Sequence, residues 1–195
     1  MSGPAVLHEL RVVVAHPRDA EGELIIRCLQ RGGANVKCTW PPPPAPDHDL
    51  DMLVCLVDAA SRSLLETATS APGLAVLGVL DPQRSDNVRL VGEVTPHALM
   101  LKPVDAADIV PHVVVAATNA KFQQRQQSKI SKLEETLRSY RKVEQAKAIL
   151  MKQRQIDEPE AYNFLREQAM RRRVSVGMIA SAVVELDDVL SDKKR

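Results

Sequence analysis

The chain has 195 residues, of which 45% are hydrophobic, 26% are charged and only 3% are aromatic. This composition is typical of a globular protein with a substantial core and excludes a disordered or fibrous chain. No segment approaches the ~20 consecutive apolar residues of a membrane-spanning helix, and the first residues lack the basic start and long apolar run of a signal peptide. The three cysteines have no C-x-x-C spacing, which disfavours a disulfide framework or a zinc site. We therefore expect a cytoplasmic protein with no membrane partner.

The net charge of +1 conceals two regions of opposite sign. Residues 1–118 contain 9 Lys and Arg against 14 Asp and Glu, whereas residues 119–195 contain 17 against 11, so the net charges are −5 and +6. This asymmetry indicates two modules with different partners. The basic region is a candidate for binding a polyanion, because phosphates favour clustered Lys and Arg through counterion release; a solvated helical surface is the alternative.

The acidic region alternates short apolar runs with helix-length segments. The expected strands are 10–15, 36–40, 52–57, 74–80 and 98–101, and the expected helices are 21–32, 61–69, 84–93 and one that starts near 106. Apolar strands that alternate with helices predict a parallel sheet covered on both faces. Their order and spacing resemble the receiver domain of bacterial response regulators, which has a flavodoxin-like α/β fold. The Lys102-Pro103 pair after the last strand is the clearest local match.

The acidic residues that a receiver uses for phosphorylation are mostly missing. Magnesium requires carboxylate ligands after the first strand, but residues 15–17 read Ala-His-Pro, and Asp19 lies too far into the loop to replace them. The phosphoacceptor position falls on Leu56. Asp58 is expected to be a turn or helix-cap residue, and would be an acceptor only if the third strand were displaced by two residues. The resemblance thus implies a pseudo-receiver, with Lys102 as a structural remnant, that binds a partner and is not phosphorylated.

Trp40 precedes four consecutive prolines, at positions 41–44. Prolines cannot donate to a strand ladder, so we expect the second strand to end here and the chain to continue as a stiff link. Packing of Trp40 against the proline rings is the favoured interpretation, and an interface anchor is the alternative.

Residues 119–155 contain neither Pro nor Gly and consist mainly of good helix formers. They predict a helix on the order of 55 Å long, too long to be covered by one compact domain. Apolar residues with the 3–4–3 spacing of a coiled-coil seam predict a dimerisation helix over 119–143, at Ile130, Leu133, Leu137 and Tyr140. An amphipathic helix that lies against its own receiver is the alternative.

The last part, residues 144–195, is predicted to form three helices. Asp157 and Glu160 form a D-x-x-E capping box with Pro159 in the first turn, and Ser175 is placed to cap the third helix. At 100° per residue, one helical face carries the core positions Ala146, Ile149, Leu150 and Gln153, and the next helix carries Ala161, Leu165, Gln168, Ala169 and Arg172. Flanking or opposite faces carry Lys147, Met151 and Arg154, and Asn163, Arg166, Met170 and Arg173.

These residues also carry a specific resemblance. The run 144–151 (EQAKAILM), then Ala161-Tyr162, Leu165-Arg166, Ala169-Met170 and Ile179-Ala180, resembles the ANTAR domain in order and spacing. With the degenerate receiver, the coiled coil and the Trp-Pro-Pro-Pro segment, nearly the whole chain is similar to ANTAR antiterminators of amidase operons. This resemblance implies binding to leader-mRNA hairpins, which prevents termination and so activates a catabolic operon.

The resemblance also implies which cations bind RNA. Lys147 matches the Ala-Lys signature, Arg166 matches the Leu-Arg pair, and Arg154 lies two turns beyond Lys147. Arg171, Arg172 and Arg173 extend the positive surface, although a favourable interaction with the helix dipole is the alternative for this triplet. Tyr162 could stack on a base, but its position beside the core favours packing.

Two protein partners are expected. A homodimer held by the coiled coil would place two RNA sites side by side and raise their effective concentration. The resemblance further implies a ligand-sensing repressor related to periplasmic binding proteins, which would contact the acidic module and release it on binding a small amide; related ANTAR regulators serve amide and nitrate sensing, so the ligand stays open.

Three other functions remain to be compared with this one: a response regulator phosphorylated at Asp58, a DNA-binding activator with a helix-turn-helix, and a protein-interaction module. An enzyme is not expected, because the sequence has no glycine-rich phosphate loop and no Ser/His/Asp or metal cluster, and its five histidines are scattered. No cofactor is expected either.

Overall fold

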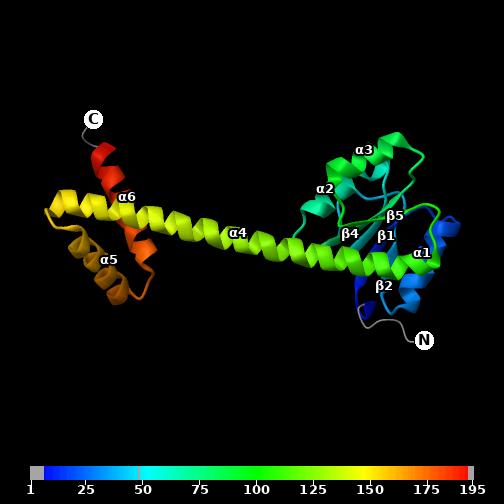
Figure 1. Ribbon diagram of the computed structural model, residues 1–195, viewed down its shortest axis with the longest axis horizontal. Helices are drawn as coiled ribbons and strands as arrows, with labels where there is room; N and C mark the ends of the chain where they lie inside the picture. Colours follow the sequence, from blue (N-terminus) through cyan, green and yellow to red (C-terminus); the bar gives the residue numbers. More distant parts are fainter. Residues whose placement is uncertain (1–6, 48, 193–195) are drawn as a thin grey trace. The chain divides into compact units, whose positions relative to one another are not determined.

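The structure is a computed structural model and describes residues 7–47 and 49–192, with side chains considered as far as residue 189. The chain divides into two compact units, residues 1–126 and 127–195, which we describe separately as the N-terminal and C-terminal units (Figure 1). Among the described residues, no helix combines the length and apolar character needed to span a bilayer.

The N-terminal unit contains a five-stranded parallel sheet (Figure 1). Its strands are β1 (Arg11–Ala15), β2 (Asn35–Cys38), β3 (Met52–Leu56), β4 (Ala75–Leu80) and β5 (Ala98–Leu101). The strand order is β2-β1-β3-β4-β5, and all neighbours run parallel. This order is that of a flavodoxin-like doubly wound fold, so the predicted fold class is confirmed.

Helices cover both faces of this sheet because alternate strand residues point to opposite sides. Val12 and Val14 of β1 belong to the core beneath α1 (Ala20–Arg31) and the first part of α4 (Ala106–Arg154). Val13 and Ala15 belong to the core beneath α2 (Arg62–Ser70) and α3 (Ser85–Val94). A short 3₁₀ helix, η2 (Ala59–Ser61), precedes α2.

Most predicted bounds in the N-terminal unit lie within one residue of the structure, and two predictions differ from it by more. The second strand lies at Asn35–Cys38 instead of 36–40, because its ladder with β1 ends where Val14 pairs with Cys38. The helix expected near 106 and the helix expected over 119–155 are one continuous helix, α4. Pro111 lies in its second turn, where it removes only one early hydrogen bond, and the helix continues to Arg154.

The C-terminal unit packs the end of α4 against α5 (Glu158–Arg172) and α6 (Val176–Asp192). Its core is small and alanine-rich, which allows the helices to approach closely; its buried members include Ala146, Leu150, Ala161, Leu165, Ala169, Ile179, Ala180 and Val184. The predicted core stripe is therefore confirmed at its apolar positions. Gln168 is only half-buried, and Gln153 and Arg172 are exposed, so these three polar residues, predicted on the core face, lie at its edge.

The predicted caps of α5 and α6 are also confirmed. The carboxylate of Asp157 accepts a hydrogen bond from the backbone N–H of Glu160 (2.8 Å), and the carboxylate of Glu160 accepts one from the N–H of Asp157 (3.4 Å). Ser175 Oγ accepts a hydrogen bond from the N–H of Met178 (3.2 Å). A side chain at Gly177 would collide with Ser139 Oγ, so the glycine permits the close approach of α6 to α4.

Candidate nucleic-acid interface

Lys147 lies in an ion-pair cluster between α4 and the start of α5. Its Nζ is 2.8 Å from Glu144 Oε1 and 2.6 Å from Glu158 Oε1, and its side chain is only 10% exposed. The hydrogen bonds to Glu144 and Glu158 raise the pKa of Lys147 above its usual value. The first sequence candidate for RNA contact is thus a charged group that already has two carboxylate partners.

The other five predicted cations are arranged differently. Arg154, Arg166, Arg171, Arg172 and Arg173 are all exposed. Within the described part of the C-terminal unit, Lys147 makes every ion pair, so these five guanidinium groups have no carboxylate partner there. Arg171 and Arg172 occupy the last turn of α5, where their charge also favours the negative end of the helix dipole, and Arg173 is the left-handed C-cap residue.

Arg154, the last residue of α4, contacts an aromatic ring. Its guanidinium carbon lies 4.1 Å from the ring centroid of Phe164 on α5, the geometry of a cation–π contact. This contact orders the guanidinium group while leaving its N–H donors available at the edge of the plane.

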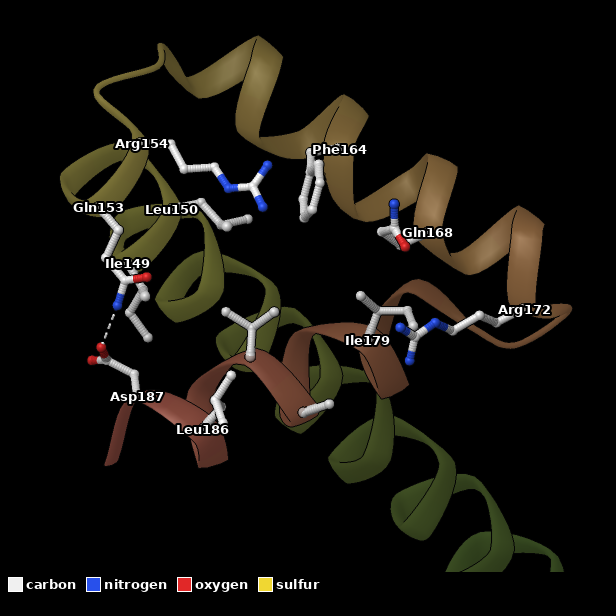
Figure 2. Close-up of a pocket in the computed structure, with 12 residues that line it drawn as sticks. Ile149, Leu150, Gln153, Arg154, Phe164, Gln168, Arg172, Ile179, Leu186 and Asp187 are labelled. Carbon is white, nitrogen blue, oxygen red and sulfur yellow. Dashed lines mark hydrogen bonds between the residues drawn. The ribbon is translucent and has the colours of Figure 1, made fainter. Parts of the chain in front are cut away.

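Arg154 and Phe164 line a cavity of about 310 Å³, which we call the α4–α5–α6 cavity (Figure 2). Gln168 and Arg172 of α5 point into it, and Leu150 and Ile179 contribute apolar side chains. At the far side, Gln153 Nε2 donates a hydrogen bond to Asp187 Oδ1 (2.7 Å). The cavity therefore combines apolar walls, one aromatic ring and both donor and acceptor groups.

Phe164 was not among the sequence-predicted site residues. It is half-buried against the core of the C-terminal unit, on the α5 stripe that also carries Gln168 and Arg172. The sequence pattern that could have identified Phe164 is an aromatic residue followed by polar residues four and eight positions later, which lie on the same helical face.

A second cavity, of about 610 Å³, lies between α4 and the first turn of α6, and Tyr140, Lys147 and Tyr162 line it. Tyr162 is 45% exposed, so it is not packed into the core as its position favoured. Its ring is available beside the ion pairs of Lys147.

The predicted coiled-coil residues form an exposed stripe on α4. Ile130, Leu133, Leu137 and Tyr140 are 47%, 64%, 57% and 63% exposed. Large apolar side chains at this spacing form an exposed apolar seam, as in a single helix of a coiled coil without its partner helix.

At the end of the sheet where β3 meets η2, the structure confirms two predictions about Asp58: it is a cap residue, and the third strand is not displaced toward it. Asp58 Oδ1 accepts a hydrogen bond from the backbone N–H of Ser61 (2.9 Å), so Asp58 caps η2. Because β3 ends at Leu56, the third strand is not displaced toward Asp58. Lys102 Nζ lies 2.8 Å from Glu21 Oε2, and this hydrogen bond lowers the pKa of Glu21. Lys102 therefore has a structural partner.

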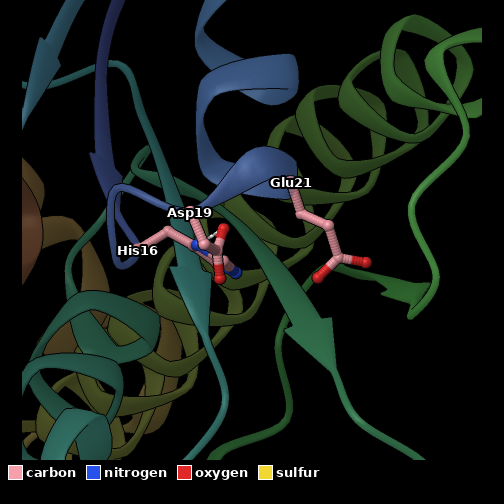
Figure 3. Close-up of side chains that lie close together, drawn as sticks. All are labelled: His16, Asp19 and Glu21. Atoms are coloured by element: carbon pink, nitrogen blue, oxygen red, sulfur yellow. Dashed lines mark ion pairs between the residues drawn. The ribbon is translucent and has the colours of Figure 1, made fainter.

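Three side chains gather where β1 leads into α1: His16, Asp19 and Glu21 (Figure 3). His16 is buried, and its Nδ1 lies 2.9 Å from the carbonyl oxygen of Pro17 and 3.4 Å from Asp19 Oδ1. Asp19 Oδ1 also accepts from the N–H of Gly22 and caps α1. Asp19 thus stabilises the start of α1, and Glu21 pairs with Lys102.

Comparison with known proteins places both units in one family. Residues 10–117 match the N-terminal domain of AmiR, and residues 131–184 match the ANTAR domain. The chain belongs to the AmiR-type ANTAR proteins. The ANTAR match begins inside the segment that we predicted as the dimerisation helix and ends within α6.

Curated relatives of this AmiR-type protein are regulators. It is 26% identical to the aliphatic amidase regulator of Pseudomonas aeruginosa over 91% of this chain and 92% of that protein. It is 24% identical to the transcriptional regulatory protein PdtaR of Mycobacterium tuberculosis over 71% of this chain and 69% of that protein. Among solved structures, a CheY-like receiver domain from Methanospirillum hungatei is 12% identical, with a TM-score of 0.49, and covers 59% of this chain and 98% of that one.

Proposed function

We propose that the chain is an RNA-binding transcription antiterminator that acts as a homodimer on leader-mRNA hairpins and activates a catabolic operon of the amidase type. The ANTAR match and the similarity to an aliphatic amidase regulator support this function. The observation that carries it is the set of exposed arginines in the C-terminal unit, Arg154, Arg166, Arg171, Arg172 and Arg173, which have no carboxylate partner among its described residues.

Exposed guanidinium groups favour binding to nucleic-acid phosphates. Each phosphate neutralised by Arg releases condensed counterions, and the planar guanidinium can donate two hydrogen bonds to one phosphate. Arg166, Arg171 and Arg173 are assigned to phosphate contacts in this proposal. Lys147 takes part through Glu144 and Glu158, because its ion pairs hold the beginning of α5 against α4.

Dimerisation is assigned to the exposed stripe on α4. Burial of Ile130, Leu133, Leu137 and Tyr140 against a second copy would remove four large apolar side chains from water. Two C-terminal units joined in this way would bind two hairpins of one transcript with a raised effective concentration.

Control is assigned to a protein partner instead of phosphorylation. This proposal takes Leu56, where β3 ends, as the residue at the phosphoacceptor position; Asp58 caps η2, and Lys102 pairs with Glu21. A ligand-sensing repressor that resembles periplasmic binding proteins, and that senses an amide or nitrate, would hold the acidic N-terminal unit until its ligand binds. No catalytic step is part of this function.

The first test is selection of RNA by the full chain. A pool of RNA hairpins with a common stem and a randomised loop is passed over the immobilised protein, with duplex DNA of the same stem sequence as competitor. We expect enrichment of defined loop sequences that the duplex does not displace. Retention of the duplex in preference to every hairpin would contradict the proposal and favour a DNA-binding activator.

The second test concerns phosphorylation. The chain is incubated with acetyl phosphate and magnesium, and its intact mass is measured beside that of Asp58→Asn. We expect no added phosphate on either protein. Stoichiometric phosphorylation that disappears in Asp58→Asn would replace repressor control by a phosphorylation-controlled response regulator.

A further inference from the structure

The geometry points to the α4–α5–α6 cavity as a nucleobase site: one unstacked base of a bound RNA loop inserts beside Phe164. This inference rests on the proposed RNA-binding function and adds a base-reading element to it. Phosphate contacts fix only the position of an RNA, whereas contacts to splayed-out bases provide sequence specificity.

The size of the cavity suits one heterocyclic base. Its volume of about 310 Å³ lies at the lower end of the range of roughly 300–1,000 Å³ for small-ligand sites. Leu150 and Ile179 provide apolar walls, and the Phe164 ring provides a flat surface for stacking (Figure 2). Bases stack on aromatic rings and on guanidinium planes, and here Arg154 already lies over Phe164 at 4.1 Å.

The polar groups around the cavity match the edges of a base. Arg154 and Arg172 offer only donors, Gln168 offers a donor and an acceptor, and the carboxylate of Asp187 offers only acceptors. A base presents both donors and acceptors along its edges, so these groups can form hydrogen bonds with it from opposite sides. Gln153 orients Asp187 through the 2.7 Å hydrogen bond.

Charge favours a nucleotide over an apolar protein side chain. Within the described part of this unit, neither Arg154 nor Arg172 has a carboxylate partner, and both line the cavity. An apolar side chain from a second copy would pack against the apolar walls of the cavity and leave both guanidinium groups unpaired. A nucleotide brings an aromatic base to Phe164 and a phosphate to the arginines, so it suits both the apolar walls and the unpaired guanidinium groups.

The test uses the full chain and the best hairpin from the selection above. Phe164→Leu keeps an apolar side chain against the core but removes the stacking surface. Phe122→Leu is the matched control, because it makes the same change at an exposed ring of α4 in the N-terminal unit, outside this cavity. We expect Phe164→Leu to raise the hairpin Kd about tenfold to a hundredfold, the range for loss of one base–aromatic stack, and Phe122→Leu to change it less than threefold.

A second arm separates a base contact from a structural effect. Each loop nucleotide is replaced in turn by an abasic residue, and Kd is measured for both the wild type and Phe164→Leu. At one loop position the abasic RNA should bind both proteins equally, because the stack is absent in each case. Gln168→Ala removes one proposed hydrogen bond to the edge of the base and little apolar volume. It should weaken hairpin binding through the same loop nucleotide about threefold to tenfold.

Each outcome decides the inference. If Phe164→Leu binds the hairpin as the wild type does, or is equally weakened with every abasic RNA, the cavity is not a base site. If Phe164→Leu instead changes the sedimentation coefficient and leaves hairpin affinity unchanged, a second copy occupies the cavity. If the wild type retains no hairpin from the pool, the RNA-binding function itself fails, and this inference fails with it.

Discussion

The two units use their charged side chains in different ways. In the N-terminal unit, Arg11 lies against Asp49 and Asp51, Arg62 against Glu66 and Glu93, and Lys102 against Glu21. In the described part of the C-terminal unit, only Lys147 has carboxylate partners. Five of the eleven Lys and Arg residues in the described part of the first unit therefore have a carboxylate partner, against one of twelve in the second, so the second unit leaves more cations available to an external polyanion. Net charge alone, −3 for residues 1–126 against +4 for residues 127–195, does not reveal this difference.

The largest effect is expected from removal of the arginines at the end of α5. The triple change Arg171→Ala, Arg172→Ala and Arg173→Ala should raise the hairpin Kd at least about a hundredfold at low salt, because up to three phosphate contacts are lost. The slope of log Kd against log salt should fall by about 2 in magnitude. The matched control replaces Arg18, Arg27 and Arg31 of the N-terminal unit by Ala and should leave both quantities unchanged. An equal loss in the control would remove the distinction between the units.

The apolar seam on α4 provides the next test. Leu133→Asn with Leu137→Asn should convert the dimer to a monomer in sedimentation, because two apolar seam positions become polar. Affinity for an RNA with two hairpins should then fall about tenfold to a hundredfold, and affinity for one hairpin should change little. Val115→Asn, an exposed apolar position of α4 outside this seam, is the control. A protein that stays dimeric after both seam changes would place the interface elsewhere.

Replacement of Lys147 distinguishes a structural role for this cation from direct binding to RNA. Lys147→Met should lower the thermal midpoint of unfolding, because Glu144 and Glu158 lose their common partner beside the core. The hairpin Kd should rise only a fewfold, with an unchanged salt slope. Lys152→Met, an exposed residue of the same helix, should leave the midpoint in place. A Lys147→Met protein of wild-type stability with a reduced salt slope would show that Lys147 contacts phosphate.

The smallest effect is expected at the Glu21–Lys102 pair. The hydrogen bond from Lys102 lowers the pKa of Glu21, so this pair stabilises the fold above the unfolded pKa of Glu, about 4.3, and the stabilisation disappears as pH falls through the folded pKa. Glu21→Gln should therefore cost about 1 kcal/mol of unfolding free energy at pH 7, and the difference from the wild type should shrink as pH falls below about 4.3 and vanish once pH is below the folded pKa of Glu21. Glu93→Gln, in a more exposed pair with Arg62, should cost less. A cost that is independent of pH would contradict the assignment.

Local patterns in the sequence were sufficient to predict most of the fold. The fifth strand has the predicted bounds, and the capping box of α5 forms as expected. The continuity of α4 could not be predicted, because Pro111 ends many helices and is tolerated here only by its place in the second turn. The ion pair of Lys147 depends on Glu158, which another helix supplies, and the position of the half-buried Phe164 at a cavity depends on where α6 packs. Such contacts arise from tertiary packing and leave no local periodicity.

Hydrogen–deuterium exchange of the full chain, with and without the selected hairpin, tests the central claim most directly. The account predicts that RNA slows exchange at the end of α4 and along α5, including the backbone around Arg154 and Arg166, and leaves the strands and α1–α3 of the N-terminal unit unchanged. Protection that appears in the N-terminal unit while α5 exchanges as before would contradict it.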